Sequence, residues 1–148
     1  MVDRKLHPHH FFSKEEKERI VAAIREAESA TSGEIRVYLE RKAKGHVMEH
    51  AKKVFEKIGM TKTKRRNGVL IYLSLKDRSF AILGDRGIHE QVGDNFWKET
   101  AAAMQEFFSR EDFAGGLESI IKKIGLKLKS IFPKQQDDTN ELPDSLMS

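Results

Sequence analysis

Residues 67–84, NGVLIYLSLKDRSFAILG, decide the fold that this sequence predicts. The run GVLIYLSL is nearly continuous in apolar and β-branched residues, which is typical of a central strand covered on both faces. Residues 76–78 then turn the chain back into SFAILG, and this pattern predicts a β-hairpin. A turn centred on Asp77 pairs residues whose numbers sum to about 154, so that Asn67 lies opposite Gly87.

Helical patterns flank the hairpin on both sides along the chain. The first opens with a capping box, in which Ser13 is the N-cap and Glu16 reaches back to it. All four patterns repeat apolar residues at the spacing of one helix face. They cover residues 13 to about 31, 47–58, 96–108 and 113–131. Trp97 shares the apolar stripe of the third pattern with Phe107 and Phe108, which predicts that it is largely buried near them.

One further strand precedes the hairpin. Residues 34–41 place Ile35, Val37 and Leu39 on one face and polar side chains on the other, which predicts a half-buried strand. A helix joins this strand to the hairpin, so a right-handed crossover makes the first two strands parallel and the hairpin adds an antiparallel third. The order of elements predicts an α/β fold, a small mixed β-sheet with helices packed on both faces in an α/β/α sandwich.

Composition and charge limit the classes of protein. The 148 residues suit one domain at 13–133, between an N-terminal arm at 1–12 and an acidic tail at 134–148 that we expect to be flexible. The net charge is +4, and the last fourteen residues hold four acids and no base, so the rest of the chain carries +8. Because the chain has no cysteine, disulfides, thiolate metal sites and cysteine nucleophiles are excluded.

Location and partners follow from the same features. No apolar run approaches the roughly 20 residues of a membrane-spanning helix, and the N-terminus has no apolar signal region, so we expect a cytoplasmic protein. The positive charge of the chain before its acidic tail can attract phosphates, nucleic acid or an anionic membrane. Interleaved lysines and glutamates favour an ordinary solvated surface instead. The sequence has no aromatic stacking set, which disfavours a nucleic-acid partner.

An anion site is predicted where three loops converge. In the predicted topology TSGE, KRRNG and GDRGIHE meet at one edge of the sheet, a common place for a ligand. Arginines there could hold phosphate, with backbone N–H groups of residues 84–87 assisting. The predicted anion-binding residues are Arg65, Arg66, Asn67, Gly68, Asp85, Arg86 and Gly87. The alternative is that GDRGIHE is a turn beside a solvated cationic loop.

Other candidate sites are weaker. Asp85, Glu90 and Asp94 could bind a metal ion, but the arginines oppose a divalent cation. In the alternative interpretation Asp85 favours a turn and Asp94 caps the next helix. His89 is a candidate catalytic acid or base, because an unperturbed histidine titrates near neutrality. No nucleophile is obviously paired with it, so a surface histidine is the alternative.

The N-terminal arm carries a further cluster of histidines. His7, His9 and His10 resemble a zinc-binding cluster, yet they lie beside Pro8 without a fixed scaffold. This favours adventitious metal binding over a dedicated site. The last helix also presents lysines opposite an apolar face, which fits a membrane-surface helix but more commonly a helix packed on a core.

Four motifs in this chain resemble the TPM domain family. They are Asn67-Gly68 at the start of the central strand, Gly87-Ile88-His89 after the hairpin, Asp94, and residues 108–117 near the last helix. The resemblance covers roughly residues 13–131. It implies an α/β/α sandwich, with calcium binding in some members and acid phosphatase activity in a thylakoid-lumen branch. Many members carry a signal peptide and a membrane anchor, whereas this chain resembles a short cytosolic bacterial branch.

The chain departs from the family at the converging edge. The aspartate often found before Asn-Gly is here Arg66, and the glutamate of Gly-Leu-Glu is here His89. Calcium takes about six to eight oxygen ligands, largely from carboxylates, so these departures disfavour it. We therefore expect a cytosolic interaction or regulatory module without a cofactor. Its partner is an unknown protein, with a membrane-anchored relative as one candidate. The alternative, implied by the resemblance, is a phosphatase-like hydrolase that depends on a divalent metal such as calcium.

Overall fold

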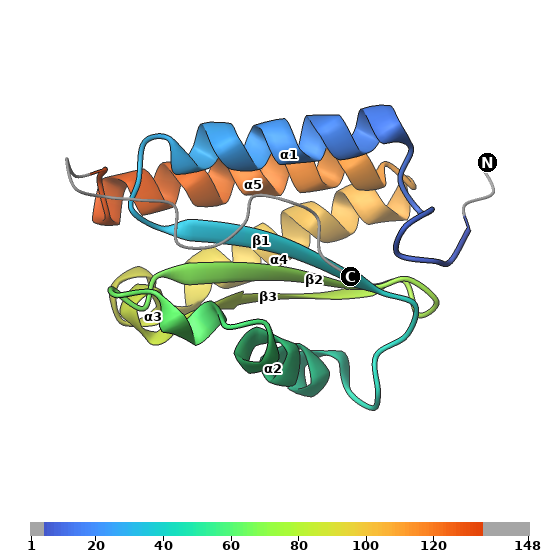
Figure 1. The fold of residues 1–148 in the computed structure, drawn as a ribbon, viewed down its shortest axis with the longest axis horizontal. Helices are drawn as coiled ribbons and strands as arrows, with labels where there is room; N and C mark the ends of the chain where they lie inside the picture. The colour runs from blue at the N-terminus through green and yellow to red at the C-terminus, as the bar shows by residue number, and fades with distance from the viewer. Residues whose placement is uncertain (1–4, 135–148) are drawn as a thin grey trace.

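Three strands form the sheet, and the computed structural model describes residues 5–134 around it (Figure 1). They are β1 (Glu34–Glu40), β2 (Gly68–Ser74) and β3 (Ser79–Gly84). β2 lies in the middle, parallel to β1 and antiparallel to β3. Every residue of β2 is buried, as expected of a strand that is paired on both edges and covered on both faces. The predicted mixed sheet and its central strand are confirmed.

The register of the hairpin differs from the predicted one by one residue. Ile71 pairs with Ile82 and not with Leu83, so the expected pairing of Asn67 with Gly87 is wrong. The turn contains four residues, 75–78, because Ser74 pairs with Ser79. Its centre therefore falls between two residues and not on Asp77.

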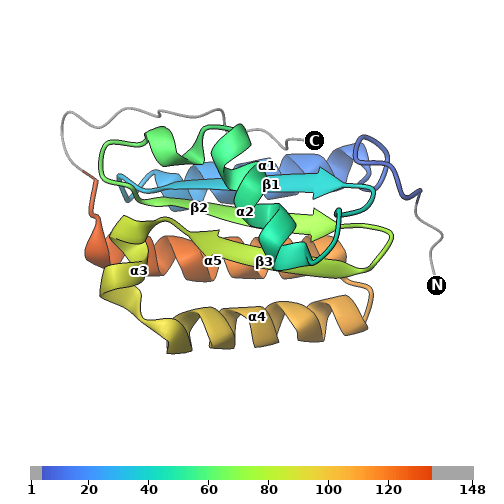
Figure 2. The ribbon, with the colours of Figure 1, turned by 90° about the horizontal axis from the view of Figure 1, so that it is seen from below.

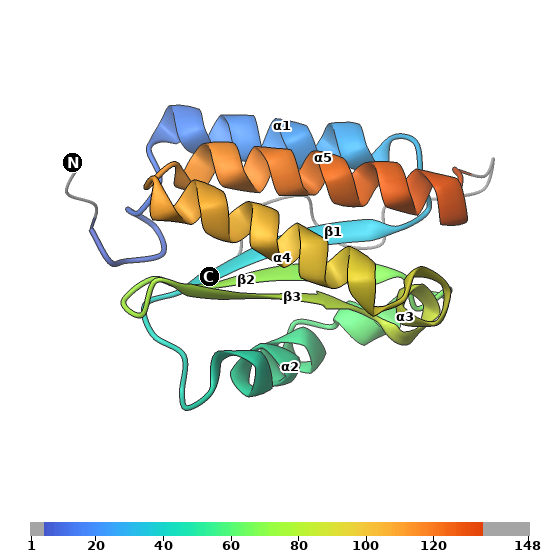
Figure 3. The same ribbon diagram turned by 180° about the vertical axis from the view of Figure 1, so that it is seen from behind.

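Helices cover both faces of the sheet, which confirms the predicted α/β/α arrangement (Figures 2 and 3). α1 (Lys14–Glu28), α4 (Asp94–Ser109) and α5 (Phe113–Ile131) lie on one face. α2 (Val47–Lys57) lies on the other and is followed by a short 3₁₀ turn, η1 (Met60–Lys62). α5 lies between α1 and α4 and packs against both.

The predicted capping box opens α1. Ser13 Oγ accepts the N–H of Glu16 at 3.1 Å, and the Glu16 carboxylate accepts the N–H of Ser13 at 2.9 Å. Near its other end α1 approaches α5 very closely, since a Cβ added at Gly125 would lie 2.6 Å from the Cβ of Ala27. A glycine in the middle of α5 therefore allows the two helix backbones to come together.

Both faces of β1 are buried. Ile35, Val37 and Leu39 contribute to the main core beneath α1, α4 and α5, as predicted. On the other face Tyr38 joins a second core beneath α2, and Arg36 is fully buried. The prediction of a half-buried strand is wrong, because aromatic packing and ion pairing cover the face that carries the polar side chains.

A helix that the sequence analysis missed follows β3. α3 (Arg86–Val92) begins at Asp85, whose side chain accepts the N–H of Arg86 as an N-cap. The segment GDRGIHE is therefore the start of a helix and not only a turn. Ile88 is the buried residue of α3, and a single buried side chain in seven residues gives too little periodicity to predict a helix.

α4 begins differently from the prediction. Gly93 occupies the N-cap position with φ of 79°, and Asp94 is the first helical residue, so Asp94 does not cap the helix. Trp97 is only partly buried, and its ring contacts Phe96 and His89 edge to face. Phe108 lies roughly 16 Å further along the helix axis. Trp97 packs against the main core, but the prediction that Phe107 and Phe108 lie near it is wrong.

The segment before α1 also reaches the core. Phe11 and Phe12 are buried, and the ring of Phe11 packs edge to face on Phe113 at 5.2 Å between centroids. From residue 135 onward the predicted acidic tail lies outside the described residues. Within residues 5–134, no helix has the length and apolar character needed to cross a membrane.

Candidate functional site

The three loops expected to converge do meet at one edge of the sheet, where β1 and β2 begin and β3 ends. The N–H of Glu34 donates to the carbonyl of Asn67 at 3.4 Å, and the N–H of Asp85 donates to the carbonyl of Gly68 at 2.9 Å. The side-chain amide of Asn67 donates to Ser32 Oγ at 3.2 Å. We call this edge the loop cluster, residues 31–34, 62–68 and 84–90.

Arg66 and Asp85 form a bidentate ion pair within the loop cluster. Arg66 Nε donates to Asp85 Oδ2 at 2.7 Å and Nη2 donates to Oδ1 at 3.0 Å. These hydrogen bonds raise the pKa of Arg66 above its usual value. The Asp85 side chain is 5% exposed, so its charge is held inside the protein with a partner of opposite charge. Arg66 also adopts φ of 51°, an uncommon conformation for a residue with a side chain.

The backbone N–H groups at the start of α3 donate within the chain. The Asp85 carbonyl accepts the N–H groups of Ile88 and His89 at 3.0 and 3.1 Å, and Gly87 donates to the carbonyl of Arg66 at 2.9 Å. A Cβ at Gly87 would collide with backbone carbonyl oxygens of Arg65 and Arg66. Gly87 therefore lets the loop before β2 lie directly against α3, and its N–H donates across that contact.

Exposed cations surround this ion pair. They are Lys62, Lys64, Arg65 and Arg86. A hollow of about 420 Å³ opens beside the cluster and is lined by Arg66, Asp85 and His89 together with Lys52 and Glu56 of α2. His89 is exposed at this hollow and lies edge to face with Trp97, at 6.2 Å between ring centroids.

The residues of the loop cluster do not fit a calcium ion. Both oxygens of Asp85 already accept hydrogen bonds from Arg66, and Oδ1 also accepts the N–H of Arg86 at 2.8 Å. Glu90, in the last turn of α3, and Asp94, the first residue of α4, are both exposed. Among the described residues no three His, Asp or Glu side chains lie together in a way that could hold a metal ion. Calcium needs several oxygen ligands at once, which this edge does not offer.

The N-terminal histidines lie near one another. The ring of His7 lies 5.3 Å from that of His9 and 5.2 Å from that of His10, between centroids. His7 Nδ1 accepts the N–H of His9 at 3.2 Å, so this nitrogen is already engaged. The three rings do not form a metal-holding group among residues 5–134.

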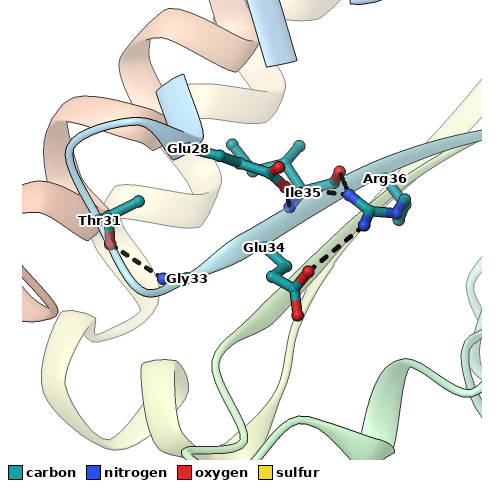
Figure 4. Close-up of polar contacts among 6 residues, drawn as sticks. All are labelled: Glu28, Thr31, Gly33, Glu34, Ile35 and Arg36. Carbon is teal, nitrogen blue, oxygen red and sulfur yellow. Dashed lines mark hydrogen bonds and ion pairs between the residues drawn. The ribbon is translucent and has the colours of Figure 1, made fainter. Parts of the chain in front are cut away.

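A buried ionic cluster beside the loop cluster was not predicted (Figure 4). Arg36 Nη1 donates to Glu28 Oε2 at 2.9 Å, and Nη2 contacts Glu34 Oε1 at 3.4 Å. The same Glu28 oxygen accepts the N–H of Ile35 at 2.7 Å. Since β1 is an edge strand, the N–H of Ile35 has no neighbouring strand to donate to on that side, and the Glu28 carboxylate accepts it instead. No local pattern signals it, because these carboxylates and the arginine meet only after α1 has turned into β1.

A second polar network lies at the opposite end of β1. Glu40 Oε1 accepts the phenolic O–H of Tyr72 at 2.8 Å and lies 2.7 Å from His50 Nε2 of α2. Burial, the hydrogen bond to Glu40 and that group's charge raise the pKa of Tyr72. Burial and the same carboxylate also raise the pKa of Tyr38. This network ties α2 to the sheet.

Comparisons with known proteins identify relatives of the chain. The family model described as TPM domain matches residues 7–127. The NMR structure of the BA42 protein from the psychrophilic bacterium Bizionia argentinensis is 44% identical, with a TM-score of 0.87, over 93% of this chain and 94% of that one. The N-terminal domain of the cg2496 protein from Corynebacterium glutamicum is 17% identical, with a TM-score of 0.65, over 88% of this chain and 81% of that one, and shares the fold. No curated protein sequence matches the chain.

Proposed function

The chain belongs to the TPM domain family, and from this premise we propose that it acts in the cytoplasm as an interaction or regulatory module that binds an anionic group at the loop cluster. The observation that carries the proposal is the ion pair between Arg66 and Asp85. It neutralises the buried carboxylate of Asp85, so that the exposed cations around the pair contribute a positive local charge.

Side chains, and not backbone amides, would hold the anion. The N–H groups from Asp85 to His89 already donate within the chain. The side chains of Arg65, in the loop before β2, and of Arg86, the first residue of α3, are exposed. A guanidinium binds a phosphate through paired hydrogen bonds, so two arginines can orient such a group. Asn67, Gly68 and Gly87 would contribute by fixing the loop backbone that spaces the arginines.

A titration followed by NMR tests the proposal. Inorganic phosphate should shift the backbone amide signals of residues 65–68 and 84–88, and salt should weaken this effect because exposed charges are screened. Calcium should leave the same signals nearly unchanged, since Asp85 is already paired. Replacing Arg65 and Arg86 by glutamine should abolish the phosphate response. Lys53→Gln on the exposed side of α2 is the matched control and should preserve it.

Two outcomes would count against this function. If calcium saturates the signals of the loop cluster at micromolar concentration, a metal site exists there in spite of the ion pair. If a phosphate ester is then hydrolysed in a metal-dependent reaction, the phosphatase-like alternative replaces the interaction module. His89, at the hollow beside Arg66, would be the first residue to replace in that case.

A further inference from the structure

The outward face of α5 carries a large apolar side chain that no core packing explains. α5 is the central helix of its layer, with α1 on one side and α4 on the other (Figure 3). The exposed residues on this face are Ser119, Lys122, Leu126, Lys129 and Ser130. Leu126 is 61% exposed, whereas the apolar residues at positions 120, 121, 124 and 128 of the same helix are buried.

Two hollows flank Leu126. The one between α4 and α5 measures about 480 Å³, with Phe96 and Leu126 as its apolar lining and Lys122, Lys123 and Lys127 around them. Lys127 Nζ lies over the ring of Phe96, 5.5 Å from its centroid. None of the described acidic side chains lines this hollow.

The hollow between α1 and α5 has a different character. It measures about 650 Å³ and is also bounded by Leu126 and Lys122, but Glu26 and Glu118 contribute to its lining. Glu118 is already paired with Arg19 of α1 at 2.5 Å. Leu126 thus lies between two hollows. The charged residues that line one of them have both signs, and those that line the other are all lysines.

We propose that the hollow between α4 and α5 is a docking site for an acidic amphipathic segment of a partner protein. An apolar side chain of that segment fills the hollow against Phe96 and Leu126, and its carboxylates pair with Lys122, Lys123 and Lys127. The proposal rests on the proposed role as an interaction module and names the surface and the chemistry of the partner. Apolar burial gives such a contact most of its affinity, whereas the rim charges give selectivity and speed of association.

Charge decides against two other occupants. A second copy of this chain that docked through the same face would place one lysine-rich face against another, and the like charges would repel. A flat anionic membrane would also approach the neighbouring helices, whose exposed glutamates include Glu26 of α1 and Glu99 and Glu106 of α4. A segment lying along the groove avoids most of those carboxylates, because a single helix with its side chains is only about 10–12 Å wide.

A peptide titration tests the docking site. The probe is a synthetic helical peptide with leucine along one face and glutamate elsewhere, added to the ¹⁵N-labelled full chain. We expect amide shifts confined to Phe96 and residues 119–130. Leu126→Ser should weaken binding at least about tenfold, as expected for an apolar anchor. Lys123→Glu should also weaken it and reduce its salt dependence. Lys53→Glu on α2 changes the net charge equally and should leave the affinity nearly unchanged.

The outcomes separate the possibilities. Equal weakening by Lys53→Glu and Lys123→Glu would show only general charge attraction and would overturn the proposal. Binding to vesicles of anionic phospholipid that needs Leu126, without binding of the peptide, would replace the protein segment by a membrane surface. The phosphate response of residues 65–68 is a separate readout. If phosphate does not shift these signals but the peptide binds, only the anion site is refuted. If phosphate shifts them but the peptide does not bind, only the docking site is refuted.

Discussion

The guanidinium of Arg66 holds the carboxylate of Asp85 through two hydrogen bonds, of 2.7 and 3.0 Å, and joins the loop before β2 to the residue that caps α3. Asp85 is buried, and Arg66 keeps 31% of its side chain exposed. The pair places a positively charged side chain beside the buried carboxylate of Asp85, and it joins the two segments.

The first prediction concerns this geometry. Arg66→Lys should lower the denaturation midpoint, because one ammonium group cannot make both hydrogen bonds to Asp85. Arg78→Lys is a matched control, since Arg78 also has a positive φ, 49°, but pairs with Glu111 at an exposed site. Exposed pairs contribute little to stability. Urea unfolding of both variants checks this, and equal shifts of the midpoint would contradict a special role for Arg66.

The second prediction concerns the buried ionic cluster. Glu28→Ala should destabilise the fold by about 3–5 kcal/mol, because it leaves the buried Arg36 with an incomplete set of partners. It also removes the acceptor of the Ile35 N–H at the edge of β1. Glu26→Ala, two residues earlier on the exposed side of α1, should change stability by less than about 0.5 kcal/mol. Chemical denaturation measures both, and a small effect of Glu28→Ala would show that the cluster relaxes easily.

The third prediction concerns the contact between α1 and α5. Gly125→Ala gains about 1 kcal/mol in helix propensity. However, the new Cβ would lie 2.6 Å from that of Ala27, and such overpacking costs about 1–3 kcal/mol. We therefore expect a net loss of thermal stability. Ser119→Ala on the exposed side of the same helix should be neutral or slightly stabilising. A stabilised Gly125→Ala variant would mean that the two helices can separate at little cost.

The fourth prediction concerns alkaline pH. The pKa of Tyr72 is raised in the folded protein by burial and by Glu40, so folding favours the neutral phenol. This contribution to stability is fully present below the unfolded value of about 10 and is lost as the pH rises through the folded value. Urea midpoints measured from neutral to alkaline pH should therefore fall less steeply for Tyr72→Phe than for the unmodified chain. Parallel curves would show that other groups, such as lysines, cause the whole decline.

Local pattern was enough to predict most elements of the fold. The run from Gly68 to Ser74 identified the buried central strand, the capping box at Ser13 identified the start of α1, and apolar spacing identified the other long helices. The parallel and antiparallel pairings followed from the order of the elements, and with them the convergence of three loops at one edge. Each of these features depends on neighbouring residues or on chain connectivity, both of which a sequence contains.

The partners of the charged side chains could not be predicted in this way. The sequence placed Arg66 and Asp85 on adjoining loops, but it did not indicate that they pair with each other, nor that Arg36 is enclosed by Glu28 and Glu34. A shift of one residue in the hairpin register, the short helix α3 and the close approach at Gly125 were also not predicted. Burial and ion pairing depend on distances of a few ångströms between segments far apart in the chain. Only the packed tertiary structure fixes those distances.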